Sequence, residues 1–200
     1  MIFAVTGGVA MGKSEVNKKL LELIPNSEVF DADAVVSELL TRDNICRKIQ
    51  KVFGDESIDE SGLINRKFIR EQVFDSVNQR AKLESILHPE VRTEYDKFIC
   101  DSQYVLNDRI LFAEIPLLYE SKSDYKCDYT IVVATDRNTQ YERLIERPAI
   151  DSSMASKIID SQMNINEKIK LCDFMIWNSG NHKQLNKQIE FFISWLKTKI

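Results

Sequence analysis

Residues 7–14 read Gly-Gly-Val-Ala-Met-Gly-Lys-Ser and match the phosphate-binding pattern G-x-x-x-x-G-K-[ST]. The glycines let the backbone turn so that successive N–H groups point at phosphate oxygens, and the helix that follows adds positive partial charge. The amine of Lys13 can reach the β and γ phosphates, and the hydroxyl of Ser14 can bind Mg²⁺. We therefore expect a nucleotide to contact Gly8, Val9, Ala10, Met11, Gly12, Lys13, Ser14 and Glu15.

Carboxylates follow two apolar segments of the chain. Asp31 and Asp33 come directly after residues 29–30, and Glu114 ends the apolar run at 110–113. In parallel α/β sheets, ligands bind beyond the carboxyl ends of the strands, so these acids are expected near a transferring phosphate. Asp33 could take the proton of an acceptor hydroxyl or cap the following helix, and the sequence leaves both interpretations open. Glu114 could hold Mg²⁺ through water, although many strands simply end in a glutamate.

Two arginines follow the apolar run at 129–134. Arg143 and Arg147 are four residues apart, so a helix would place both on one face. Two guanidinium groups there could stabilise the charge on phosphate oxygens during transfer. The interleaved Glu142 and Glu146 also fit a solvated helix face. The phosphate-binding loop in the same chain favours a phosphate-binding lid.

The elements that must position these side chains follow from apolar spacing. Continuous apolar runs predict strands at residues 1–6, 29–30, 110–113, 129–134 and 174–177. Apolar residues at helical spacing predict helices that include residues 16–24, 45–53, 91–99 and 185–196. Pro89, which follows His88, is expected at the first position of the third of these helices. Strands that alternate with helices predict an α/β fold with a parallel five-stranded sheet flanked by helices.

One connection in this pattern is unusually long. Almost 80 residues separate residue 30 from residue 109 without a convincing strand, far more than a simple crossover needs. This stretch predicts a helical insert. We expect a single domain over residues 1–200, with a core at 1–32 and 104–200, a helical substrate lobe at about 33–103 and a lid at about 137–165.

Composition limits the classes of partner. The 200 residues carry a net charge of −4, with 44% hydrophobic and 29% charged residues. These values exclude a disordered chain and argue against a broad surface for nucleic acid or anionic membrane. The chain start lacks signal-peptide character, and no apolar run is long enough to span a bilayer. We expect a cytoplasmic protein, monomeric or weakly homo-oligomeric, with small-molecule partners and neither nucleic acid nor membrane among them.

The phosphate-binding loop indicates nucleotide binding without fixing the reaction. The guanine-reading pattern N-K-x-D is absent from the sequence. The short chain, the helical insert and the arginine pair favour a small-molecule kinase. A kinase for a nucleoside, nucleotide or sugar, and a nucleotide-binding regulator without transfer chemistry, are the alternatives that the residues alone leave open.

Several segments together resemble the dephospho-CoA kinase family, which belongs to the P-loop kinases. They are residues 6–14 and 31–33, Leu-His-Pro-Glu-Val-Arg at 87–92, Pro-Leu-Leu-Tyr-Glu at 116–120, 140–147 with Gln162, and 172–180. Their order and spacing cover nearly the whole chain. The resemblance implies an ATP-dependent kinase that uses Mg²⁺ and phosphorylates the ribose 3′-hydroxyl of dephospho-CoA, giving coenzyme A and ADP.

The same resemblance implies roles for individual residues. Asp33 would act as the general base, while Arg143 and Arg147 would belong to the lid. Residues placed near ligands by their position are Asn178 and Gly180 for the adenine of ATP, and Arg66 and His88 for the acceptor.

The chain departs from the family pattern at a few positions. Ala10 and Met11 stand where the family usually has Gly and Ser, and Glu15 stands where Thr is common. Because backbone N–H groups still surround the phosphates, we expect a changed nucleotide affinity rather than a different class of protein. Pro148 is expected to shorten or bend the helix after Arg147.

Overall fold

The computed structural model describes residues 1–74, 76–105, 109–121, 124–148 and 150–199. It divides into two compact units. One is formed by Met1–Phe30 together with Gln103–Ile200, and the other is Asp31–Ser102.

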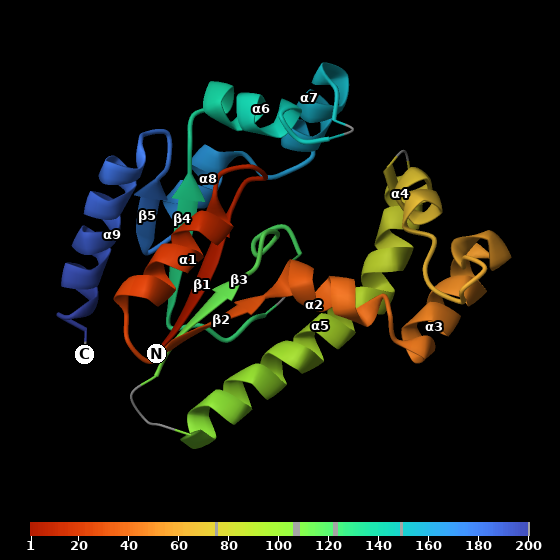
Figure 1. Cartoon of the computed structure of the whole chain (residues 1–200), viewed down its shortest axis with the longest axis horizontal. Helices are drawn as coiled ribbons and strands as arrows, with labels where there is room; N and C mark the ends of the chain where they lie inside the picture. Colours follow the sequence, from red (N-terminus) through yellow and green to blue (C-terminus); the bar gives the residue numbers. More distant parts are fainter. Residues whose placement is uncertain (75, 106–108, 122–123, 149, 200) are drawn as a thin grey trace. The chain divides into compact units, whose positions relative to one another are not determined.

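A five-stranded sheet forms the centre of the first unit (Figure 1). Its strands are β1 (Ile2–Gly7), β2 (Ser27–Asp31), β3 (Ile110–Glu114), β4 (Tyr129–Ala134) and β5 (Phe174–Trp177), in the spatial order β2-β3-β1-β4-β5. β1 pairs in parallel with β3 and β4, and β4 pairs in parallel with β5. This pairing confirms the predicted parallel sheet. The prediction was possible because continuous apolar runs of this length are typical of strands that are buried on both faces.

Helices of this unit cover the sheet and extend beyond its carboxyl edge. They are α1 (Lys13–Leu23), α6 (Arg137–Ile145), α7 (Ser152–Asp160), α8 (Ile165–Leu171) and α9 (His182–Leu196). The apolar faces of α1 and α9 join the strands in one buried cluster, in which Phe3 stacks on Phe112 and meets Phe192 edge-on. Figure 1 shows α6 and α7 beyond the carboxyl ends of β1 and β4, where the predicted lid belongs.

The helix that was predicted to carry both Arg143 and Arg147 is shorter than predicted. α6 ends at Ile145, and the N–H of Arg147 donates to the carbonyl of Leu144 (3.2 Å) in a turn beyond the helix. Arg143 therefore lies on the helix and Arg147 lies past its end, so the prediction that both share a helix face is wrong. Pro148 explains the early end, because its ring disfavours helical backbone at the preceding residue.

The second unit is helical. It contains α2 (Ala32–Leu39), α3 (Asp43–Phe53), the short 3₁₀ helix η1 (Asp55–Ser57), α4 (Arg66–Phe74) and α5 (Val77–Val105), whose last residues pass into the first unit. Its described part has no strand, only an isolated antiparallel bridge between Ile58 and Ile64. Among all described helices of the chain, none is both long and apolar enough to cross a membrane.

Pro89 lies inside a helix rather than at its start. α5 continues from Val77 through Pro89 to Val105, so the prediction of a helix that begins at Pro89 is wrong. The proline removes one N–H from the helical bonding pattern. Leu87 and Val91, on either side of the proline, are both buried, and such burial stabilises a helix that has lost one backbone bond. The Pro-containing sequence resembles a helix start because the compensating burial depends on tertiary packing.

Candidate functional site

The phosphate-binding loop connects β1 to α1. Gly7 ends the strand with φ +148°, and a Cβ atom there would overlap the carbonyl oxygen of Val133 on the neighbouring strand. Gly12 has φ +86°, and a Cβ atom there would overlap the amide nitrogen of Asn178. Each position therefore requires glycine for both its backbone conformation and its space.

Lys13 begins α1 and its side chain folds back over the loop. The residue is buried, and its amine donates to the carbonyl of Gly8 (3.1 Å) and approaches that of Gly7 (3.5 Å). These contacts hold a cation at the start of a helix, where the helix dipole also favours a bound anion. The arrangement is suited to phosphate.

Side chains from outside the loop fix its first turn. The N–H of Val9 donates to Oε1 of Gln162 (2.8 Å), and the carbonyl of Val9 accepts from Nε2 of Gln140 (2.9 Å). The N–H of Gly8 points at the sulfur of Met11 (3.2 Å), which is buried. The N–H groups of Gly8 and Val9 are thus already engaged within the protein.

The two inner departures from the family pattern have structural consequences. Ala10 adopts φ +57°, a left-handed conformation that costs a non-glycine residue about 1–2 kcal/mol. Met11 fills the base of the loop and belongs to the main hydrophobic cluster. The loop therefore keeps its shape through the packing of Met11 rather than through a small residue.

A carboxylate lies next to the loop serine. Oε1 of Glu114, at the end of β3, accepts from the hydroxyl of Ser14 (3.3 Å), and Oε2 accepts from Nδ2 of Asn17 (2.7 Å). Sequence analysis missed Asn17, although its place three residues after Ser14 puts both on one face of α1.

The Ser14 and Glu114 oxygens fit the ligand preference of Mg²⁺. The described ranges contain no group of three or more His, Cys, Asp or Glu side chains that could hold a metal ion by themselves. Mg²⁺ usually binds few protein ligands and keeps water and substrate phosphate oxygens. The hydroxyl of Ser14 and the buried carboxylate of Glu114 beside the phosphate-binding loop would supply such a small set of protein ligands.

A cleft of about 390 Å³ opens beside the loop. Its lining residues are Ala10, Gly12, Glu15, Arg143, Arg147, Asn178, Gly180, Asn181 and His182. The structure thus brings together the predicted lid arginines and the residues predicted near adenine. Nη1 of Arg143 is buried and has no hydrogen-bond partner among the described residues, which leaves a guanidinium nitrogen available to a ligand.

Asn178 links this cleft to the loop. Its side chain is buried, and Nδ2 donates to the carbonyl of Met11 (3.2 Å) and to Oε2 of Glu15 (3.2 Å). Oε1 of Glu15 lies 3.0 Å from Nδ1 of His182. Glu15, which stands where the family often has Thr, is therefore held by two partners rather than directed freely toward a nucleotide. Sequence analysis missed His182 because nothing near it in the chain indicates this contact.

A second cleft of about 460 Å³ lies in the same unit and includes Gly8, Asp136, Arg137, Gln140 and Gln162 in its lining. Asp136 caps α6. Hydrogen bonds from the hydroxyl of Ser179 (2.7 Å) and the N–H and hydroxyl of Thr139 (2.9 and 2.7 Å) hold the pKa of Asp136 well below its ordinary value. Arg137 forms an ion pair with Asp160 (2.7 Å).

The predicted acceptor residues lie in the second unit. Asp31, not Asp33, caps α2, since its carboxylate accepts from the N–H of Ala34 (3.0 Å), and Asp33 lies in the first turn. Arg66 reaches the same helix by donating to the carbonyl of Ser37 (3.2 Å). The hydroxyl of Ser37 in turn donates to the carbonyl of Asp33 (3.0 Å).

His88 is the remaining residue predicted near the acceptor. It lies on α5 and is half-buried. No polar contact within the described part of the chain ties its side chain to Arg66, which donates to the backbone of α2 instead.

Comparison with known proteins gives a consistent result. A sequence model of the dephospho-CoA kinase family matches residues 1–184. The dephospho-CoA kinase of Fusobacterium nucleatum is 36% identical over 192 residues, which is 96% of this chain and 96% of that protein. The dephospho-CoA kinase of Bacillus cereus is 35% identical over 196 residues, again 96% of each chain.

A solved structure agrees with the sequence comparisons. The dephospho-CoA kinase from Campylobacter jejuni superposes with a TM-score of 0.61 and 26% identity, covering 96% of this chain and 95% of that one. The resemblance seen in separate segments of the sequence therefore extends over the whole fold, and this chain belongs to the dephospho-CoA kinase family.

Proposed function

We propose that this protein transfers the γ-phosphoryl group of ATP to the ribose 3′-hydroxyl of dephospho-CoA and releases coenzyme A and ADP. The match of the family over residues 1–184 is the observation that carries the proposal. The phosphate-binding loop and the cleft with two arginines supply independent chemical support, because both suit a nucleoside triphosphate.

The nucleotide would occupy the loop and the cleft beside it. The phosphates would lie against the N-terminus of α1 and the amine of Lys13. Arg143 and Arg147 would stabilise the charge that spreads over the transferring phosphoryl oxygens. Asn178 and Gly180 would lie near the adenine. Nη1 of Arg143, which has no partner among the described residues, favours the assignment of this arginine to the phosphates.

Mg²⁺ would be held by the hydroxyl of Ser14 and, through water, by Glu114. When bound, the ion neutralises charge on the β and γ phosphates. Asn17 holds Glu114 in place through its 2.7 Å hydrogen bond and so keeps the carboxylate beside the loop.

Asp33 would act on the acceptor. Its carboxylate would accept the proton of the ribose 3′-hydroxyl as that oxygen forms a bond to the γ phosphorus and the bond from phosphorus to the ADP oxygen breaks. The cap of α2 is Asp31, and Asp33 lies in the first turn of the same helix. Arg66 and His88 would bind the remainder of the acceptor.

Two small molecules would then be the partners of the protein. A net charge of −4 supports neither a nucleic-acid nor an anionic-membrane surface. A cytoplasmic location and a monomeric or weakly self-associating state remain predictions of the sequence.

The direct test combines the protein with ATP, Mg²⁺ and dephospho-CoA and measures ADP and coenzyme A. We expect equal amounts of both products. The Lys13→Met variant, purified identically, controls for a contaminating kinase. Adenosine, ribose and a nucleoside monophosphate are tested in place of dephospho-CoA, and we expect each to be phosphorylated more slowly. A protein that forms no coenzyme A while both substrates are saturating would contradict the proposal.

A further inference from the structure

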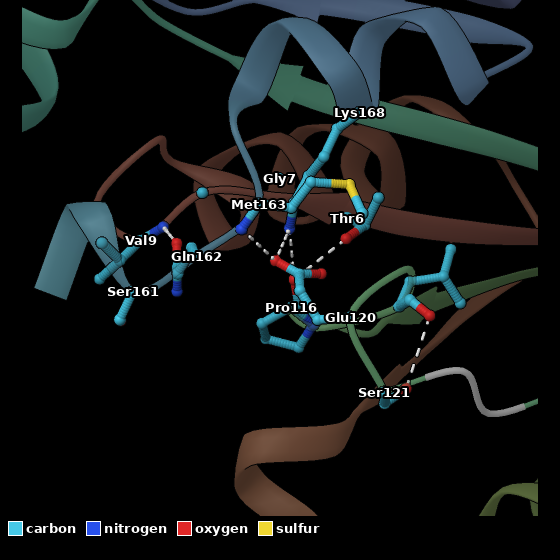
Figure 2. Close-up of polar contacts among 12 residues, drawn as sticks. Thr6, Gly7, Val9, Pro116, Glu120, Ser121, Ser161, Gln162, Met163 and Lys168 are labelled. Atoms are coloured by element: carbon cyan, nitrogen blue, oxygen red, sulfur yellow. Dashed lines mark hydrogen bonds and ion pairs between the residues drawn. The ribbon is translucent and has the colours of Figure 1, made fainter. Parts of the chain in front are cut away.

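Lys168, on α8, is a buried lysine outside the residues assigned so far. Its side chain has no exposed surface, and Nζ lies 2.8 Å from Oε1 of Glu120 and donates to the carbonyl of Pro116 (3.1 Å). Figure 2 shows the amine directed at both oxygens. A buried ammonium group is costly unless it is paired, so the position of Lys168 depends on these two partners.

The two partners of Lys168 connect further segments. Oε1 of Glu120 also accepts from the N–H of Met163 (3.1 Å), in the loop between α7 and α8. The carbonyl of Pro116 also accepts from the hydroxyl of Thr6 (3.1 Å), one residue before the end of β1. The ion pair therefore joins α8, the segment after β3, the loop between α7 and α8 and the strand that leads into the phosphate-binding loop (Figure 2).

The loop between α7 and α8, which we call the lid loop, contacts the phosphate-binding loop through Gln162, the residue before Met163. Gln162 directly precedes Met163, and its Oε1 accepts from the N–H of Val9 (2.8 Å). Gln140 holds the carbonyl of Val9 (2.9 Å). The N–H and the carbonyl of Val9 are thus both held by side chains. The position of one of these side chains, Gln162, depends on the backbone of the adjacent Met163.

We propose that Lys168 is a positioning residue for the nucleotide site. By holding Glu120, it fixes the backbone of Met163 and so keeps the amide of Gln162 on Val9. Without the lysine charge, the partly buried carboxylate of Glu120, whose Oε2 is covered by protein, would have to take up water or turn toward solvent, which would release Met163. Oε2 of Glu120 has no partner within the described residues, so no other cation stands ready to replace the amine. This inference rests on the proposed role of the loop in binding ATP.

The Lys168→Met variant tests the inference, because it keeps the length of the side chain and removes the charge. We measure ATP binding by calorimetry, kcat and KM for ATP, and the ¹⁵N–¹H signal of Val9. The expected result is a shifted Val9 signal and a decrease in kcat/KM of about 10- to 100-fold, the scale expected when a site is misplaced by about 1 Å. Leu196→Ala, in the core at the far end of α9, is the control for lost stability and should leave all three readouts unchanged.

A double-mutant cycle between Lys168 and Gln162 distinguishes a positioning role of Lys168 from a general effect on stability. If Lys168 acts through Gln162, the losses of kcat/KM in Lys168→Met and Gln162→Ala will not multiply in the double variant. Independent, multiplicative losses, or a Val9 signal unchanged in Lys168→Met, would overturn the inference.

A second variant covers the case in which Lys168→Met does not fold. Lys168→Met with Glu120→Met removes both charges and should fold, since a buried pair tolerates apolar replacement. We expect this double variant to show the decrease in kcat/KM and the shifted Val9 signal predicted for Lys168→Met. ATP binding and kinetics equal to those of the wild type would overturn the inference. The Val9 signal and ATP binding require no acceptor, so a failure of the wild type to form coenzyme A would contradict the proposed function separately.

Discussion

The hydroxyl of Ser14 lies 3.3 Å from Oε1 of Glu114, although 100 positions separate the two residues in the sequence. The parallel pairing of β1 with β3 creates this proximity, because Val5 and Glu114 are register partners and α1 starts just beyond β1. The second oxygen of Glu114 accepts from Asn17 (2.7 Å). A buried carboxylate is thus fixed beside a loop hydroxyl where Mg²⁺ would bind an ATP phosphate.

The first prediction concerns this carboxylate. Glu114→Gln keeps the shape of the side chain and removes its charge, so the affinity for Mg²⁺ should fall. We expect the Mg²⁺ concentration for half-maximal activity to rise about 10- to 100-fold, the usual effect of losing an outer ligand partner. Glu190→Gln, an exposed position on α9, is the control. Equal Mg²⁺ dependence in the two variants would show that Glu114 does not serve the metal.

The second prediction concerns the general base. Asp33→Asn should retain ATP binding and lose transfer by at least about 100-fold, because the amide cannot accept the proton of the 3′-hydroxyl. Single-turnover measurements with bound ATP isolate this step. Asp43→Asn is a matched control, since Asp43 occupies the first turn of α3 as Asp33 occupies that of α2. Near-normal turnover in Asp33→Asn would remove Asp33 from the mechanism.

The third prediction compares two arginines on α6. Arg143 lines the cleft beside the loop and has a buried nitrogen without a described partner, whereas Arg137 pairs with Asp160 (2.7 Å). Arg143→Ala should lower kcat/KM for ATP by about 100-fold or more, the scale of one lost charge-stabilising group. Arg143→Lys should recover part of this loss, since lysine restores the charge without the planar fork.

Arg137→Ala is the control for Arg143→Ala. Its ion pair is solvent-exposed and contributes little to stability, so its kinetic effect should be several-fold at most. The assignment of Arg143 to ATP would be rejected if both alanine variants lost activity to the same extent.

Sequence patterns predicted the elements better than their ends. The strands at 110–113 and 129–134 were predictable because a continuous apolar run depends only on burial. The start of α5 was not predictable, because the helix begins at Val77 and continues through Pro89, where Leu87 and Val91 on either side are buried. A local rule for proline cannot include that packing.

The parts of the site differ in the same way. The loop at residues 7–14 was predictable because its backbone demands glycines and a lysine at fixed spacing. The Lys168–Glu120 pair was not, since a buried ion pair has no periodicity and its members lie on separate segments. The position of Asn17 was predictable in part. Helical spacing from Ser14 places it on the same face of α1, but the sequence does not indicate that its partner is Glu114.

The fourth prediction tests the space at Gly12. Gly12→Ala places a methyl group against the side chain of Asn178 and also strains a backbone with φ +86°. Gly54 has φ +87° but ψ 176°, a region that is essentially limited to glycine, and nothing lies within 4 Å of its would-be Cβ, so Gly54→Ala carries backbone strain alone, about 1–3 kcal/mol. We expect both variants to lose stability, and only Gly12→Ala to weaken ATP binding. Unchanged ATP affinity in Gly12→Ala would show that the contact with Asn178 does not shape the site.

The fifth prediction follows from the hydrogen bonds of Asp136. The hydroxyl of Ser179 and then the N–H of Thr139 stabilise the charged carboxylate and lower its pKa from the ordinary 3.8. A group whose pKa is lowered on folding contributes stability above its unfolded pKa, and that contribution disappears as the pH falls through the folded pKa. Asp136 should therefore stabilise the protein fully at neutral pH and progressively less below about pH 4.

The Asp136→Ala variant makes this dependence measurable. At pH 7 it should unfold at a lower urea concentration than the wild type, because α6 loses its cap and Ser179 loses an acceptor. The gap between the two midpoints should stay constant from pH 7 to pH 5 and narrow below pH 4, where the carboxyl of the unfolded chain takes up a proton that the folded carboxylate does not. Ser179 contributes most to the low folded-state pKa, so Ser179→Ala should raise the pH at which the stabilisation by Asp136 is completely lost, while the onset near pH 4, set by the unfolded carboxyl, should not move. A gap that is independent of pH down to pH 3 would mean that Asp136 stabilises α6 by shape rather than by charge.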